Sequence, residues 1–188
     1  IERRLKDVGY IKNIVAYYRR EVDAALAVRP HLRRASAGES IPDFTPDTVK
    51  SFTRGESEYF FAGKRPGVAS FDTPKAVGEY VGRVVRVEKN RFRLDRGGLL
   101  AAGDGICFLT DRGFAGTNVN AADGDCVTPN RMEGIVPGTE VYRNYDHRFN
   151  QLLARSRTRR VIPASVLVEA TEGGDRFSYT DCEGVTAS

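Results

Sequence analysis

The sequence is poor in the residues that most often carry chemistry. It has three cysteines, two histidines and one methionine among 188 residues. The cysteines are odd in number and widely spaced, and none of them forms a Cys-x-x-Cys pair. This usage argues against a disulfide framework and against a zinc knuckle. Three widely spaced cysteines without a pairing motif are typical of a protein from a reducing compartment, so we expect a cytoplasmic protein.

Long apolar runs are also missing. No stretch approaches the roughly 20 residues that a helix needs to cross a bilayer, and no charged and then apolar leader opens the chain. We therefore expect no membrane partner. The chain begins at Ile1, without an initiator methionine, and its first residues already read as the approach to a helix. We expect a piece of a longer polypeptide that lacks residues at both ends.

The few candidate catalytic residues have no partner motif around them. His31 follows a proline in a basic turn and His147 stands near a predicted helix start, and no His-Glu-x-x-His occurs. Cys107 could in principle be a nucleophile, but it stands between Ile106 and Phe108 in an apparent core strand. A buried, inert thiol is the better interpretation. We predict no catalytic residue, no metal site and no cofactor in this chain.

The remaining loop residues are explained by turn geometry. Gly103-Asp104-Gly105 and Asp123-Gly124-Asp125 offer carboxylates, but the alternating oxygen ligands and distal glutamate of a calcium loop are absent. Aspartate and glycine are the usual residues of tight turns. Cys126 and Cys182 fall in polar turns, and nothing near them indicates an activated thiol.

What the chain does contain is typical of a globular protein. Hydrophobic residues make up 40% and charged residues 29%, with a formal net charge of +4. Residues 3–27 show the strongest helical pattern, with apolar side chains at steps of three and four, at Leu5, Val8, Ile11, Val15, Tyr18, Val22 and Leu26. We predict that residues 1–34 form a helix that belongs to, or packs on, an upstream domain.

Residues 35–77 read as a loop-rich connector. Within it, Thr45 followed by Pro46 predicts the N-cap and first position of a short helix that ends near Gly55. From residue 78 the pattern changes to short strands separated by turns, at residues 80–87, 91–95, 106–109, 116–119 and 140–143. This spacing predicts a small antiparallel β-barrel over residues 78–145.

Residues 146–188 predict a helix over 146–155 and then the opening hairpin of a further β unit, with strands at 166–170 and 176–180. The predicted fold class is therefore α+β. An amphipathic N-terminal helix and a loop-rich segment precede the small barrel, and the start of another β unit follows it.

Two basic tracts remain as candidate contact surfaces. The first comprises Arg83, Arg86, Lys89, Arg91, Arg93 and Arg96, and the second comprises Arg155, Arg157, Arg159 and Arg160. On a small barrel such residues could follow a phosphate backbone or contact another partner. The alternatives are a solubilising rim and a domain interface. The aromatic residues that would stack bases are not interleaved with these arginines, which weakens the nucleic-acid interpretation.

Five runs in the same order resemble the collagenase-like region that follows the catalytic barrel in peptidase family U32. They span residues 4–146 and read RLKD with YIKNIVAYYR, then KSFTRG, GEYVGRV, GDGICF with NVN, and GTEVYRNYD. The resemblance implies an upstream α/β barrel in the same polypeptide and further β modules downstream. The cysteines of the family's chemistry belong to that upstream barrel, so the resemblance assigns no catalytic role to this chain.

The resemblance implies two kinds of activity, because members are named as peptidases or collagenases and relatives hydroxylate a pyrimidine in transfer or ribosomal RNA. We first interpret the chain as an accessory or substrate-presenting region of a peptidase, with a protein substrate. The second interpretation is an RNA-docking module of an RNA-hydroxylating relative. The third is a structural spacer between domains. Convergence of the two basic tracts would favour RNA, and ion pairing within them would favour the spacer.

Overall fold

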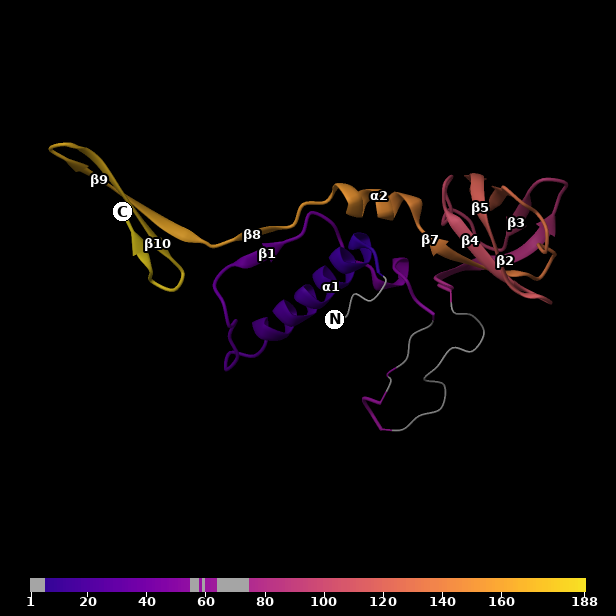
Figure 1. Cartoon of the computed structure of the whole chain (residues 1–188), viewed down its shortest axis with the longest axis horizontal. Coiled ribbons are helices and arrows are strands. Elements are labelled where there is room, and N and C mark those ends of the chain that lie inside the picture. Colours follow the sequence, from indigo (N-terminus) through magenta and orange to yellow (C-terminus); the bar gives the residue numbers. More distant parts are fainter. Residues whose placement is uncertain (1–5, 55–57, 59, 64–74) are drawn as a thin grey trace. The chain divides into compact units, whose positions relative to one another are not determined.

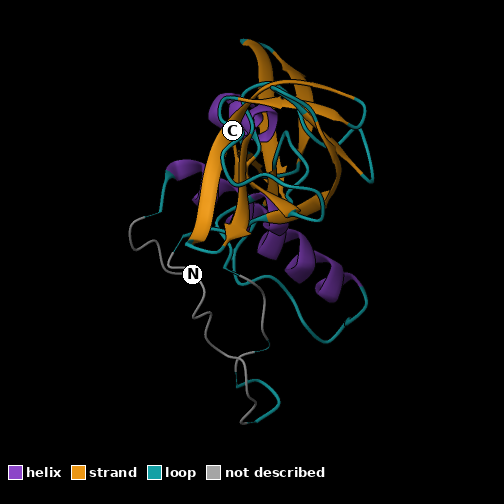
Figure 2. Ribbon diagram, turned by 90° about the vertical axis from the view of Figure 1, so that its right-hand side faces the viewer, coloured by secondary structure: helices purple, strands orange, loops and turns teal. Residues whose placement is uncertain are grey.

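The computed structural model describes residues 6–54, 58, 60–63 and 75–188. Strands make up most of the regular structure in this part of the chain, which also contains two α-helices (Figure 2). The fold is α+β, as the sequence predicts. The chain divides into two compact units, one of residues 1–14 and 46–155 and the other of residues 15–45 and 156–188.

Six antiparallel strands of the first unit close into a barrel, with the strand order β2–β3–β6–β5–β4–β7. Figure 1 shows these strands in magenta to orange. Pairing of β2 with β7 completes the ring, which leaves no free strand edge in the barrel. The strands are β2 (Glu79–Val87), β3 (Phe92–Leu94), β4 (Gly105–Thr110), β5 (Gly113–Asp123), β6 (Cys126–Pro129) and β7 (Glu140–Tyr145).

Alternation of apolar and polar residues sets which side chains enter the barrel. Phe92 and Leu94 of β3 are buried, and Arg93 between them faces outward. In β2 the register shifts between Val84 and Arg86, so one residue is inserted at this point. The β-bulge keeps Val84 in the core and leaves both following residues exposed. Eleven buried apolar residues form the barrel core: Val81, Val84, Phe92, Leu94, Leu100, Ile106, Phe108, Val119, Val127, Ile135 and Val141.

Two strand predictions need correction. The strand expected at residues 116–119 extends over Gly113–Asp123, and Cys126, expected in a polar turn, begins β6. The β6 strand has only four residues and ends at a proline, so no periodic pattern marks it. Its pairing with β3 and β5 fixes it in place. The strand state of these residues is thus set by pairing with neighbouring strands and not by a local sequence pattern.

Gly78 sets the entry into the barrel. Its φ of +81° lies in the left-handed region, and a Cβ atom there would collide with the carbonyl oxygen of Arg143 in β7. Only glycine permits both the backbone angle and this approach of the chain to the neighbouring strand.

A buried ionic network joins the barrel to the helix that follows it. Arg143, with 8% of its side chain exposed, forms ion pairs with Glu79, Asp104 and Asp146. Asp104 is completely buried and accepts hydrogen bonds from the backbone amides of Ala101 and His147, each at 2.9 Å. The sequence assigned Asp104 to turn geometry alone. In the structure its carboxylate also binds β7 and the start of the next helix.

Asp146 is the N-cap of α2 (His147–Arg155), because its carboxylate accepts a hydrogen bond from the amide of Phe149 at 2.8 Å. The same carboxylate pairs with Lys50 at 2.9 Å. Burial alone would raise the pKa of Asp146. The bonds from Lys50 and Phe149 and the charge of Arg143 outweigh burial and hold this pKa below its usual value of 3.8.

The connector contains the short helix η1 (Thr48–Lys50). Its N-cap is Asp47, whose side chain accepts from the Val49 amide, and not Thr45 as the sequence predicts. The helix is a single 3-10 turn, so the capping residue stands immediately before it. Buried Asn13 of α1 (Val8–Ala27) fixes this turn through hydrogen bonds with the backbone of Asp47 and the hydroxyl of Ser51. Leu5 and Gly55, which the predicted helices include, lie outside the described residues.

The second unit contains the later part of α1 and two small sheets. Strand β1 (Glu39–Ile41) pairs with β8 (Arg159–Val161), and neither strand was predicted. The predicted hairpin is present as β9 (Ala164–Thr171) and β10 (Gly174–Asp181), with β11 (Thr186–Ala187) at its side.

One face of this hairpin sheet is apolar and exposed. Val166 lies opposite Tyr179 and Val168 lies opposite Phe177, and each of the four side chains is about half exposed. The apolar stripe of α1 is also partly uncovered, since Val8, Val15, Tyr18 and Val22 are exposed.

Candidate nucleic-acid interface

Most arginines of the first predicted tract have carboxylate partners. Arg83 pairs with Glu140 of β7 at 2.7 Å, and Arg93 pairs with Asp125 at 2.9 Å. Arg91 donates to Glu88, and this hydrogen bond lowers the pKa of the glutamate below its usual value. These pairs are solvent-exposed, and such pairs contribute little to stability. They nevertheless offset much of the positive charge on this side of the barrel.

Three residues of this tract, Arg86, Lys89 and Arg96, have no close ion pair within the described residues. Arg86 is the most exposed of the arginines, with 71% of its side chain in contact with solvent. Its ion pair with Glu88 is long at 3.7 Å, and that of Arg96 with Asp95 is 3.9 Å. Arg86 lies directly across from Arg93 on the neighbouring strand. The exposed Lys89 lies between β2 and β3. The assignment of this tract to nucleic-acid or partner contact stays a prediction.

The second predicted tract does not lie within one unit. Arg155 is exposed in the last turn of α2, which belongs to the first unit. Arg157, Arg159 and Arg160 belong to the second unit. Arg160 donates to Ser36 and to the carbonyl of Ala37, so it holds the loop before β1. The four arginines are thus divided between the two units, and their contact role also stays a prediction.

A pocket of about 430 Å³ lies where the β4–β5 hairpin turns, beside the loop that follows β6. We call it the mouth pocket, and its lining residues are Phe108, Thr110, Asp111, Arg112, Gly113, Phe114, Ala115, Gly116, Thr117, Arg131, Glu133 and Gly134. Phe108 belongs to the barrel core and Ala115 packs against it. The mouth pocket therefore borders the barrel core at one end of the β4–β5 hairpin, and the mouths of β-barrels are common positions for binding sites.

Local hydrogen bonds hold the two sides of the mouth pocket in place. The Thr110 hydroxyl accepts from the Arg112 amide at 3.2 Å and donates to the Gly113 carbonyl at 2.7 Å, which closes the β4–β5 turn. On the other side, the Arg131 amide donates to the Thr117 hydroxyl at 3.0 Å and ties the loop to β5. Backbone contacts thus position both arginines, and their guanidinium groups extend from anchored residues.

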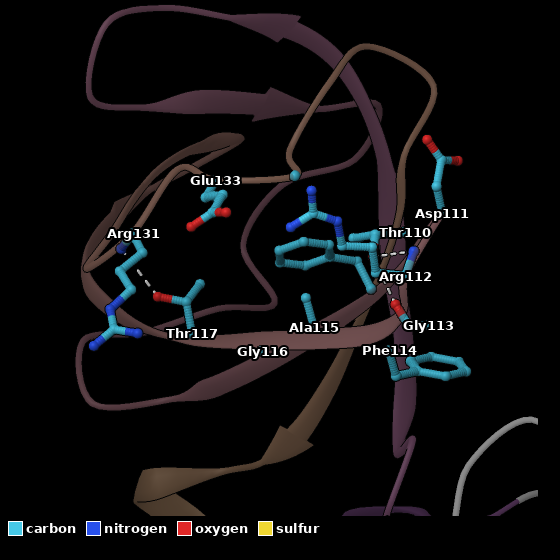
Figure 3. Close-up of a pocket in the computed structure, with 12 residues that line it drawn as sticks. Thr110, Asp111, Arg112, Gly113, Phe114, Ala115, Gly116, Thr117, Arg131 and Glu133 are labelled. Carbon is cyan, nitrogen blue, oxygen red and sulfur yellow. Dashed lines mark hydrogen bonds between the residues drawn. The ribbon is translucent and has the colours of Figure 1, made fainter.

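The charged groups around the mouth pocket differ from the predicted tracts. Within the described ranges, the guanidinium groups of Arg112 and Arg131 have no ion pair or hydrogen bond, and both residues are exposed. Glu133 is also exposed at the edge of the pocket. In Figure 3 the Arg112 side chain reaches from the turn across the pocket, toward the side where Glu133 lies, and Arg131 lies beyond it next to Thr117.

Arg112 and Arg131 were not predicted as site residues, because each is an isolated arginine among turn residues and belongs to no basic tract. They are 19 positions apart, and only the β4–β5–β6 pairing places them around one pocket. The sequence Asp111-Arg112-Gly113 did indicate that Arg112 lies at a hairpin tip, because it is a turn sequence between two predicted strands. In a barrel, side chains at hairpin tips gather at the ends of the barrel.

The histidines are found where the sequence predicts them. His31 is exposed, and His147 is the first residue of α2. The described residues contain no group of three or more His, Cys, Asp or Glu side chains that could hold a metal ion. Among these same residues, no helix is both long and apolar enough to cross a membrane.

Cys107 is buried, as predicted, and its thiol donates to the carbonyl of Val77 at 3.3 Å. Burial raises the pKa of this thiol to about 11. At pH 8 only about one Cys107 in a thousand is therefore a thiolate, the form that reacts. We expect a disulfide reagent such as DTNB to label Cys182 and Cys126 in the native protein and Cys107 only after denaturant is added. Equal labelling rates for all three thiols would contradict this assignment.

Comparison with known proteins gives one informative match. Over 195 aligned residues the chain is 34% identical to a protein of Escherichia coli (strain K12) named 23S rRNA 5-hydroxycytidine C2501 synthase. The alignment covers 99% of this chain but only 30% of that protein, so the chain spans less than a third of the relative's length. No family model matches the chain. No solved structure matches it.

The match changes the order of the three interpretations. The similarity to an RNA-hydroxylating protein supports the RNA interpretation better than the peptidase interpretation. The comparisons give no support to a proteolytic role, which was the first interpretation of the sequence.

Proposed function

We propose that this chain is an RNA-binding part of a longer RNA-hydroxylating protein and that it contacts RNA around the mouth pocket. The observation that carries the proposal is the similarity to the Escherichia coli 23S rRNA protein along 99% of the chain. The resemblance to family U32 is consistent with this proposal, because some relatives of that family hydroxylate RNA. The proposal gives the chain a role in recognition and assigns no chemical step to its residues.

The electrostatics of the mouth pocket support this choice of surface. Phosphate contacts supply most of the non-specific affinity of a protein for nucleic acid, and arginine is the side chain best suited to them. Arg112 and Arg131 have no intramolecular ion pair to break in the part of the chain that the structure describes. An arginine such as Arg83 must first exchange Glu140 for a phosphate. The mouth pocket is therefore the less costly docking surface.

The proposal also gives a role to the exposed stripe of α1. Val8, Val15, Tyr18 and Val22 would pack against another part of the longer polypeptide. Amphipathic helices bury such stripes in stable proteins. In this arrangement α1 attaches the barrel to the rest of the enzyme.

A spacer between domains is the second candidate function. The ion pairs of Arg83, Arg91 and Arg93 favour this function. On a surface that binds RNA, arginines are expected to be free of carboxylate partners and available to phosphates. A spacer would bind RNA weakly and without preference for one surface.

Charge reversal at the mouth pocket tests the proposal. The double variant Arg112→Glu/Arg131→Glu is expected to bind a 23S rRNA transcript at least about tenfold more weakly than the unchanged chain at 100 mM salt. Fluorescence anisotropy over a salt titration should also show the slope of log K against log salt reduced by at least about 0.7, the contribution of one lost phosphate contact.

The matched control is Arg83→Glu/Arg91→Glu, which makes the same change in charge at paired positions of the barrel. We expect a smaller loss of affinity for this control. Equal losses would assign RNA contact to the general charge of the barrel and not to the mouth pocket. Absence of binding by the unchanged chain, even at low salt, would reject the proposal in favour of the spacer.

A further inference from the structure

The mouth pocket has both positive and negative side chains at its opening, and this combination restricts the kind of ligand that it can bind. Arg112 and Arg131 offer guanidinium groups, while Glu133 offers a carboxylate at the same opening. A free phosphate would be attracted by the arginines and repelled by Glu133. A ligand with an anionic end and a hydrogen-bond-donating end satisfies all three side chains. A nucleotide whose base has an amino group meets this description.

The inner surface of the mouth pocket is suited to a flat ring. Ala115 and Gly116 of β5 and Gly134 of the opposite loop contribute little or no side chain, and Phe108 lies at the core side. Gly134 has a φ of +81°, and a Cβ atom there would lie 2.9 Å from the Thr110 methyl group and 3.2 Å from the Phe108 ring. The loop can approach β4 so closely only because this residue is glycine.

Arg112 can cover the other side of such a ring. Its side chain extends across the pocket from the hairpin turn (Figure 3). A guanidinium plane stacks on bases that have left a helix, a common device in the recognition of single-stranded RNA. Phe114 does not serve this purpose, because Figure 3 shows its ring pointing away from the pocket.

We propose that the mouth pocket binds one unstacked RNA nucleotide whose base bears an exocyclic amino group. Glu133 accepts a hydrogen bond from that amino group, Arg112 stacks on the base, and Arg131 binds a flanking phosphate. Uracil is disfavoured, because carbonyl oxygens flank its only ring N–H and repel the carboxylate. This inference rests on the proposed RNA-binding function and adds the class of nucleotide that is recognised.

Base discrimination by single-stranded probes tests the inference. Labelled octamers of cytidine and of uridine differ only at the 4-position of the ring, which bears an amino or a carbonyl group, and in the proton that uracil carries on N3. The chain is expected to bind the cytidine octamer about tenfold more tightly than the uridine octamer. It should bind a duplex of equal length more weakly than the cytidine octamer, because paired bases cannot enter the pocket.

Glu133→Gln is expected to reduce this discrimination to about threefold or less, since the neutral amide loses the charge that favours an amino group. Asp123→Asn is the matched control. It makes the same change in charge at the last residue of β5, which is exposed and does not line the mouth pocket, so the tenfold preference should remain.

The outcomes separate this inference from the proposed function. Equal binding of the two octamers, or equal effects of the two variants, would overturn the nucleotide assignment. RNA binding that still depends on Arg112 and Arg131 would then leave the proposed function standing. If neither octamer nor the 23S rRNA transcript binds, both proposals fail.

Discussion

Replacing Arg143 by methionine is expected to lower the free energy of unfolding by about 3–5 kcal/mol. Methionine has a similar length and no charge, so the space is largely filled while every ion pair is lost. Asp104, which is fully buried, and the nearly buried Asp146 would then keep their negative charges without this cation. The loss comes mainly from these carboxylates left unpaired in a low-dielectric interior.

Urea unfolding followed by circular dichroism measures this loss. The control is Arg83→Met, which removes an exposed pair with Glu140 and should change stability by less than about 1 kcal/mol. If Arg143→Met unfolds within about 1 kcal/mol of the unchanged chain, the network contributes little, and α2 must be held by its apolar contacts instead. Leu153 and Phe149 are the buried residues that would provide them.

The contrast between these two arginines shows what a sequence can indicate about charge. Both stand in strands with alternating patterns, and nothing local separates them. Arg143 enters the network because Asp104, 39 positions earlier, is brought beside β7 by strand pairing. Arg83 becomes paired because Glu140, 57 positions later, lies opposite it in the register of β2 and β7. Charge partners at such separations depend on the strand order and register, which no local sequence pattern indicates.

The strands and hairpins were largely predictable because their signals are local. The β2–β3 hairpin follows from two alternating runs around Lys89-Asn90, and the amide of Glu88 closes it onto the carbonyl of Arg91 at 2.8 Å. The β9–β10 hairpin has the same kind of signal around its Gly-Gly turn. The β1–β8 pair has no such signal, since its two three-residue strands are 118 or more positions apart.

The candidate site was predictable only in part. From the sequence, the tract with the most closely spaced arginines was predicted as the contact surface. The structure shows that the number of arginines in a tract does not indicate how much charge is available for a partner, because Glu88, Asp125 and Glu140 form ion pairs with this tract. The mouth pocket depends on two isolated arginines in turns, and on a barrel that places those turns together. Its detection required the strand order.

Replacing Phe108 by alanine is expected to cost about 3–5 kcal/mol of stability, comparable to the loss of Arg143. The Phe108 ring is 1% exposed and belongs to the core of the barrel, where it packs with the inward residues of the neighbouring strands. Its removal loses the transfer free energy of the ring and leaves a cavity, which the closed barrel cannot readily collapse because its strands are bonded on both edges.

Thermal and urea unfolding of three variants distinguish this core role from a surface role. Phe108→Leu fills most of the space and should cost only about 1–1.5 kcal/mol. Phe114→Ala removes a half-buried ring six residues later and should cost less than Phe108→Ala. Because Phe108 also lines the mouth pocket, its truncation deepens the site where a base is proposed to lie. A Phe108→Ala protein as stable as the unchanged chain would mean that the barrel can repack around this position. The floor of the mouth pocket would then not be the rigid surface on which the nucleotide assignment depends.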